Sequence, residues 1–76
     1  MGHHINCYLQ FGRNLRAYRK SIGYFQIDIA VATNLNRTYV SRIENGKARV
    51  TFDVITKLVR GLHISSDILM RMDNSN

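Results

Sequence analysis

The segment NLNRTYVSRIENGK, residues 34–47, carries polar and cationic side chains at the spacing of one helix face. Residues three and four apart project together on a helix, and the polar ones with this spacing are Arg37, Thr38, Ser41, Arg42 and Asn45. Val40 and Ile43 point the other way and can anchor the helix to a core. The outward face therefore offers hydrogen-bond donors, acceptors and positive charge, which suits recognition of a polar partner rather than covalent catalysis.

Side chains suited to catalysis or metal binding are sparse in the rest of the chain. The five acidic residues are scattered singly, and no catalytic or phosphate-loop motif occurs. Cys7 is the single cysteine, so it cannot form an internal disulfide, and His3, His4 and His63 lack the spacing of zinc ligands. We expect no enzyme, no metal site, no cofactor and no small-molecule ligand.

Positive charge is concentrated around the polar helix. Eleven Lys and Arg against five Asp and Glu give a net charge of +6. Residues 37–49 contain one acid, Glu44, and four of the basic residues: Arg37, Arg42, Lys47 and Arg49. The plain alternative is the solvated surface of a small basic protein. The concentration of charge beside a polar helix face favours a polyanionic partner instead.

Length and apolar content predict one small domain over residues 1–76, with its core at about residues 9–72. The chain has 76 residues, 45% of them hydrophobic, near the lower limit for a core that folds unaided. No apolar run approaches the roughly 18 residues that span a bilayer. The N-terminus lacks the apolar stretch and cleavage site of a secretory signal. We therefore expect a cytoplasmic protein.

Hydrophobic periodicity predicts an all-α fold. The chain has no proline, and no stretch alternates polar and apolar residues over the length of a strand. Capping residues and three-and-four apolar spacing place five helices: about Asn6–Ile22, Gln26–Thr33, from the N-cap Asn36 to Asn45-Gly46, from the N-cap Thr51 to Gly61, and a short one capped by Ser65 or Ser66. The fourth helix should turn one apolar stripe inward: Phe52, Ile55, Leu58, Val59 and Leu62.

The order of these signals resembles a known family. FGRNLRAYRKSIG, then FQIDIAVATNLNRTYVSRIENGK, then a capped helix after a basic turn is similar to the XRE-type helix-turn-helix repressors related to phage repressor and Cro. The resemblance covers about residues 9–70, and its most specific residues are Gln26, Ala30, Ser41, Ile43, Glu44 and Gly46. It implies a compact five-helix, lambda repressor-like domain that binds double-stranded DNA and regulates transcription.

Within that family the chain looks most like the controller proteins of restriction–modification systems. The segments NRTYVS and ARVTFDVI, the latter without proline, carry this narrower resemblance. Antitoxins and plasmid or prophage repressors use the same module and remain alternatives. From other classes, an adaptor that binds an acidic protein and an RNA binder also remain, although the chain offers no aromatic platform for stacking RNA bases.

The resemblance assigns a contact surface to the polar helix and its flanks. The residues it places toward DNA are Gln26, Asn36, Arg37, Thr38, Tyr39, Ser41, Arg42, Lys47 and Arg49. Arg37 and Arg42 suit guanine in the major groove, and Thr38 suits a base edge or a thymine methyl. Tyr39 could contact DNA or pack against the second helix. Ser41 could be structural, and Lys47 and Arg49 could be merely solvated.

The resemblance also implies a structural pair and reveals three departures. Arg19 and Glu44 should form a partly buried ion pair that joins the first and third helices. Phe25 stands where the family has a Ser or Thr cap. Ile27 and Val31 are apolar where the family is polar, so they are either covered by Ile5 and Tyr8 or form a contact surface.

A two-fold DNA site requires two copies of so small a domain. The C-terminal part carries more apolar residues than one short helix needs, and we expect these to form the seam of a homodimer: Ile64, Ile68, Leu69 and Met72. The alternative is that all four complete the core of the monomer.

Overall fold

The computed structural model describes residues 7–72, and these residues form helices without any strand. The helices are α1 (Cys7–Ser21), α2 (Gln26–Thr33), α3 (Arg37–Glu44), α4 (Phe52–Leu62) and α5 (Ser66–Met70). The all-α prediction is confirmed, and the bounds of α2 and α3 match the predicted ranges. The predicted start at Asn6 and the side chain of Ile5 lie outside the described residues.

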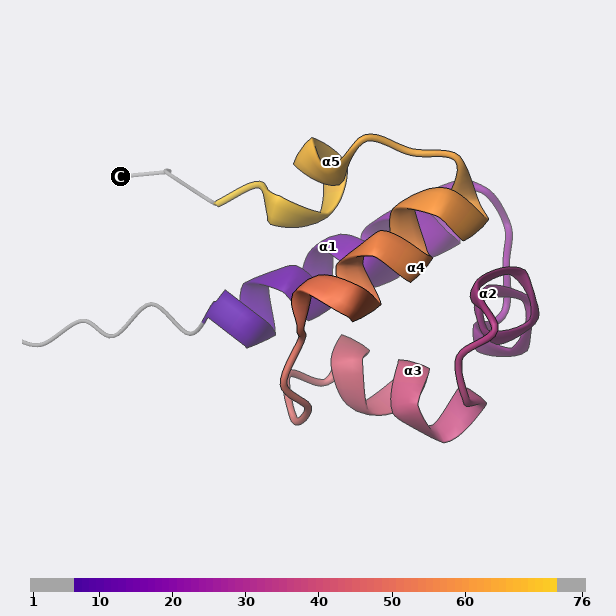
Figure 1. The fold of residues 1–76 in the computed structure, drawn as a ribbon, viewed down its shortest axis with the longest axis horizontal. Helices are drawn as coiled ribbons and strands as arrows, with labels where there is room; N and C mark the ends of the chain where they lie inside the picture. Colours follow the sequence, from indigo (N-terminus) through magenta and orange to yellow (C-terminus); the bar gives the residue numbers. More distant parts are fainter. Residues whose placement is uncertain (1–6, 73–76) are drawn as a thin grey trace, which may run out of the picture.

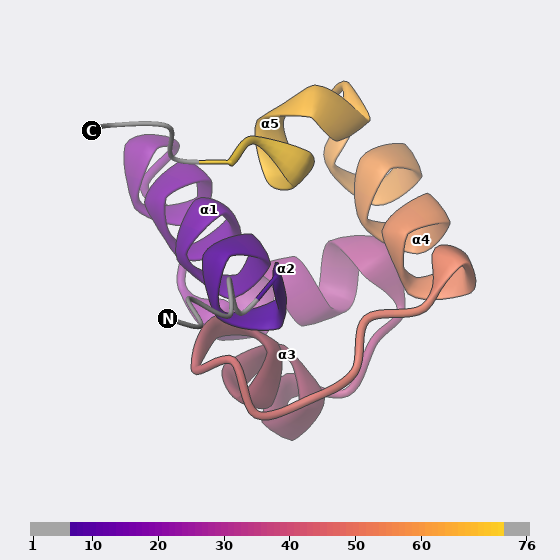
Figure 2. The same ribbon diagram turned by 90° about the vertical axis from the view of Figure 1, so that its left-hand side faces the viewer.

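The helices enclose a common core (Figure 1). In the view of Figure 2, α1 and α4 lie on opposite sides, with α5 above and α3 below. α1 contacts α3 and α5, and α2 contacts α3 and α4. The fully buried side chains between them come from all five helices: Leu15, Ile29, Val40, Ile43, Leu58 and Leu69. Val40 and Ile43 thus anchor α3, as predicted from the sequence.

Two glycines allow helices to approach each other closely. A Cβ at Gly12 of α1 would overlap the carbonyl oxygen of Ile43 in α3. A Cβ at Gly61 would overlap the carbonyl oxygen of Ala32 in α2. The sequence prediction that Gly61 ends the fourth helix was wrong, because α4 continues to Leu62 and ends at His63, whose φ is 56°.

Short turns and side-chain caps set the remaining helix ends. Gly23 and Gly46 have φ values of 75° and 72°, as their predicted positions after α1 and α3 require. The side chain of Asn36 accepts from the backbone N–H groups of Thr38 and Tyr39 at 2.7 and 3.3 Å. Thr51 Oγ1 caps α4 through Val54 N–H at 3.2 Å, and Ser65 caps α5.

The predicted inward stripe of the fourth helix was wrong at its first position. Phe52 is 84% exposed, whereas Val54, which the sequence prediction left out, is buried. Thr51 is the N-cap, so Phe52 is the first helical residue. With that phase, Val54, Leu58 and Leu62 recur every fourth residue and face the core together.

The predicted dimer seam also contains one residue of the monomer core. Leu69 has 0% exposure and packs among the residues of α1 and α4, which favours the alternative that it completes the monomer core. Ile64 and Ile68 are half-buried and pack against the same core. Met72, half-buried, follows the end of α5.

Candidate nucleic-acid interface

α3 presents its polar face to solvent. Asn36, Arg37, Thr38 and Arg42 are exposed, and Ser41 is half-buried. Asn36 caps the first turn through its Oδ1 atom, and its amide N–H groups take no part in these cap bonds. The exposed start of α3 therefore combines a guanidinium, a hydroxyl and an amide, three groups that can donate hydrogen bonds to base edges or phosphates.

A charged cluster fixes α3 against α1 and α2. Arg19 Nε and Nη2 donate to Glu44 Oε2 and Oε1 at 2.7 and 3.1 Å, which is the ion pair expected from the sequence. Gln26 Nε2 donates to the same Oε1 at 3.0 Å. Arg19 Nη1 also donates to the carbonyl oxygen of Tyr24 at 2.9 Å. The Glu44 side chain, 2% exposed, thus collects donors from the first two helices.

This cluster changes the role of Gln26. Its amide was expected to contact a phosphate, and one of its N–H bonds is instead directed at Glu44. The amide carries a second N–H, so Gln26 can donate to a phosphate while it is held in place. The hydrogen bond from Gln26 to Glu44 joins the start of α2 to the end of α3.

The turn after α3 is fastened back onto the helix. Arg42 Nη2 donates to the carbonyl oxygen of Lys47 at 2.6 Å. Tyr39 Oη donates to the carbonyl oxygen of Arg49 at 2.8 Å, so its hydroxyl hydrogen is directed at the turn rather than at DNA or α2. Lys47 and Arg49 themselves are exposed. Two α3 side chains therefore hold the basic turn in place beside the polar face.

The start of α2 carries an acid that the sequence prediction overlooked. Phe25, at the N-cap position, is 74% exposed and makes no side-chain cap. Asp28 Oδ2 accepts from the backbone N–H of Phe25 at 2.7 Å, which supplies half of the missing cap. The carboxylate adds negative charge at the helix end where a phosphate would otherwise be favoured.

Arg37 and Gln26 are brought together beside this helix start. They line one shallow hollow with Arg19, Phe25 and Ile27. Farther along α2, Val31 is 76% exposed. Tyr8 does not cover Ile27 or Val31, because it lies against Phe11 and Val50 in a different hollow. Ile27 and Val31 of α2 are therefore exposed apolar side chains, whereas Ile29 and Ala30 lie in the core.

A neutral hydrogen-bond cluster escaped the sequence analysis. Asn14 Nδ2 donates to the carbonyl oxygens of Leu69 and Arg71 at 2.8 and 2.7 Å. Its Oδ1 accepts from Gln10 Nε2 at 3.0 Å. This arrangement fastens α5 and the residues after it onto α1, on the side of the core opposite α3.

Comparison with protein families identifies the family to which this five-helix domain belongs. A helix-turn-helix family model matches residues 15–69, which include all of α2, α3 and α4. The chain belongs to the XRE-type helix-turn-helix family. Members of this family bind double-stranded DNA and regulate transcription.

A solved structure supports the same assignment. The restriction-modification controller protein C.AhdI from Aeromonas hydrophila is 34% identical, with a TM-score of 0.77. The match covers 82% of this chain and 94% of C.AhdI. Comparison with curated protein sequences gave no significant match. In residues 7–72, no helix is long and apolar enough to cross a membrane.

Proposed function

We propose that this chain is a homodimeric transcriptional regulator that binds a two-fold operator and acts as the controller protein of a restriction–modification system. The observation that carries the proposal is the exposed polar face of α3, held by a buried charged cluster in a helix-turn-helix domain. The likeness to C.AhdI over 82% of the chain supports the narrower role.

Sequence preference comes mainly from the first turn of α3. The N-terminal residues of a recognition helix reach base edges in the major groove. Arg37 can donate two hydrogen bonds to guanine O6 and N7, a contact that discriminates by about 1–3 kcal/mol. Thr38 contacts the neighbouring base. Arg42 reads DNA with the N–H groups that Lys47 leaves available, and the half-buried Ser41 lets α3 approach the groove.

Affinity comes mainly from contacts to the DNA backbone. Lys47 and Arg49 extend from a turn that Arg42 and Tyr39 hold in place, so their charges stay beside α3. Gln26 and Asn36 donate amide N–H groups to phosphates on either side of the groove. Two such domains, one per half-site, read the operator one DNA turn apart. The protein concentration sets the occupancy.

A titration of labelled DNA tests the proposal. Sequences bound by the protein are first selected from a random duplex pool, and the selected operator is then titrated at several salt concentrations. A dimer that neutralises about 4–8 phosphates gives a slope of roughly −4 to −7 for log affinity against log salt. An adaptor that binds only acidic proteins gives no enriched sequence and no binding to duplex DNA at low salt.

Substitution of Lys47 sharpens this test. K47A should flatten the slope by about two, one phosphate per subunit, and leave the selected sequence unchanged. K57A is the matched control, because Lys57 lies on α4 and pairs with Asp53 at 3.6 Å. An unchanged slope in K47A contradicts the assigned backbone contact.

A further inference from the structure

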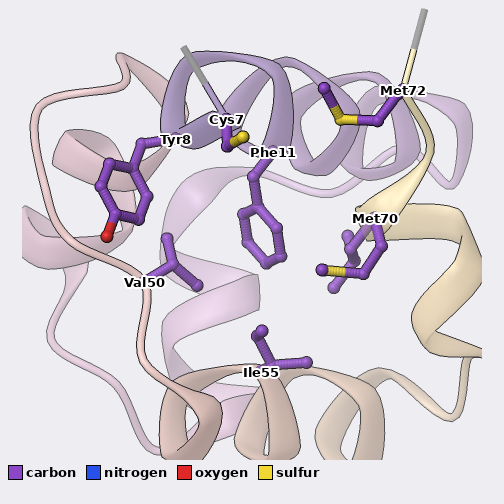
Figure 3. Close-up of a pocket in the computed structure, with 8 residues that line it drawn as sticks. Cys7, Tyr8, Phe11, Val50, Ile55, Met70 and Met72 are labelled. Atoms are coloured by element: carbon purple, nitrogen blue, oxygen red, sulfur yellow. The ribbon is translucent and has the colours of Figure 1, made fainter. Parts of the chain in front are cut away.

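One side of the domain carries an apolar hollow. Its volume is about 220 Å³, and it lies between α1, the loop before α4, α4 itself and α5. The side chains that define it are Phe11, Val50, Ile55, Leu69, Met70 and Met72. Figure 3 shows Phe11 pointing into the middle of the hollow, with Ile55 opposite and Met70 at its side. A hollow lined in this way offers water almost no hydrogen-bond partners.

Phe52 is exposed near the edge of this hollow. It has the highest exposure of the large hydrophobic residues described, 84%. It precedes Ile55 by three positions on α4, so the two side chains lie on neighbouring parts of one helix face. Within residues 7–72, an exposed aromatic ring thus lies one helical turn from Ile55, which lines an apolar hollow that no described side chain fills.

We propose that two copies of this chain exchange Phe52: the ring from each copy fills the hollow of the other. The proposal rests on the proposed function, because a two-fold operator requires two recognition helices. It replaces most of the seam expected from the sequence. Met72 stays at the contact as a lining residue, Leu69 forms the floor of the hollow, and Ile64 and Ile68 complete the monomer core.

The position of the hollow relative to α3 suits this exchange. The side of the molecule in Figure 2 shows α1, α4 and α5 around the region of the hollow, with α3 along the lower edge. A two-fold axis perpendicular to that lower edge leaves both copies of α3 on one side of the dimer.

Charges at the rim favour a second copy over a polyanion. Asp67 and Arg71 lie beside Met70. This pair carries both signs, in contrast to the basic turn at Lys47 and Arg49. A two-fold contact runs the two surfaces in opposite directions, so an acidic group of one copy can face a basic group of the other.

Sedimentation of the full chain and of the F52A variant tests the exchange. Each dimer of F52A loses two buried aromatic rings, so we expect its dissociation constant to rise at least about a hundredfold. F25A is the matched control, because Phe25 is also an exposed aromatic at a helix start but lies on α2. It should sediment as the wild type does. Circular dichroism of F52A should match the wild type, since Phe52 contributes little to the monomer core.

A double substitution tests whether the ring enters this particular hollow. Met70 is 51% exposed, so M70A leaves the monomer folded while it removes one wall of the hollow. If the partner's ring contacts Met70, the double variant F52A/M70A should dimerise about as weakly as F52A alone. If the dissociation constants of the two single variants combine multiplicatively in the double variant, the exchange is overturned. It is also overturned if F52A sediments as the wild type does, or if the wild type is monomeric.

DNA binding separates failure of this inference from failure of the proposed function. If the wild type binds a selected operator and F52A remains an equally strong dimer, the exchange alone is wrong. If the wild type binds no duplex DNA, the proposed function is wrong, and sedimentation still decides the exchange. Should F52A remain dimeric while removal of residues 1–6 lowers the melting temperature, the hollow is filled by the chain's own N-terminus, and the exchange is overturned.

Discussion

Two polar clusters attach the rest of the domain to α1, and they differ in charge and in what they hold. Near the C-terminal end of α1, Arg19 and Glu44 form an almost fully buried ion pair that Gln26 completes. Near its middle, Asn14 binds two backbone carbonyl groups after α4 with neutral amide hydrogens. The charged cluster holds α3, to which we assign DNA reading, and the neutral one holds the side with the apolar hollow.

The difference separates the side proposed to read DNA from the side proposed to contact a second copy. A buried ion pair with all its donors satisfied admits few alternative geometries, and loss of either partner leaves an uncompensated charge. It therefore fixes α3 relative to α1 and α2. Two neutral hydrogen bonds are individually weaker. We therefore expect α5 and the residues after it to adjust more easily than α3 does.

The largest effect should follow from removal of Glu44. In E44A, the guanidinium of Arg19 and the amide of Gln26 lose their common acceptor inside the protein. The free energy of unfolding should fall by about 3–5 kcal/mol, measured by urea denaturation. D53A removes an acid of the exposed Asp53–Lys57 pair and should change it by less than about 0.5 kcal/mol. Equal effects of the two substitutions would remove the distinction between buried and exposed pairs.

A smaller and more local effect should follow from removal of Asn14. N14D keeps the size of the side chain but removes both hydrogens that bind the carbonyl groups of Leu69 and Arg71. Unfolding should become easier by about 1–3 kcal/mol. Amide hydrogen exchange should accelerate in α5 much more than in α3. Equal acceleration at Ile43 and Leu69 would show that the two clusters are not independent.

The smallest effect concerns the acid at the start of α2. D28N keeps an oxygen that can accept from the N–H of Phe25 but removes the negative charge. A charge at a helix end contributes about 0.3–1 kcal/mol, so operator affinity at low salt should rise about two- to fivefold per subunit. D53N, at the start of α4, is the control and should leave operator affinity unchanged. Weaker binding by D28N would place α2 away from the DNA backbone.

Sequence reasoning succeeded where structure depends on neighbouring residues. Asn36 and Thr51 predict helix starts, because the side chain of a capping residue accepts a hydrogen bond from a backbone N–H two or three residues later. Gly23 and Gly46 predict helix ends, because few other residues adopt the positive φ that a helix end often needs. The family resemblance added Arg19 with Glu44, which are 25 residues apart and have no local signature.

The remaining features depend on contacts that leave no mark in the sequence. Asn14 binds the carbonyl oxygen of Leu69, 55 residues away, and a backbone acceptor is the same for every residue type. Phe52 has apolar helical spacing to Ile55 and so fits a stripe read from the sequence, whereas in the structure the buried positions are Val54, Leu58 and Leu62. Gly61 permits close packing rather than a turn, and either use is open to glycine.

The reading of bases by the first turn of α3 is tested most directly by measuring how one arginine and one lysine substitution change the affinity for two DNAs. R37A and K47A are each titrated, at one salt concentration, with the selected operator and with a random duplex of equal length. R37A should lose roughly thirtyfold or more on the operator, because the dimer loses two contacts of about 1–3 kcal/mol each, and much less on random DNA. K47A should lose affinity for both DNAs to a similar extent. Equal losses on the two DNAs for R37A would contradict base reading by α3.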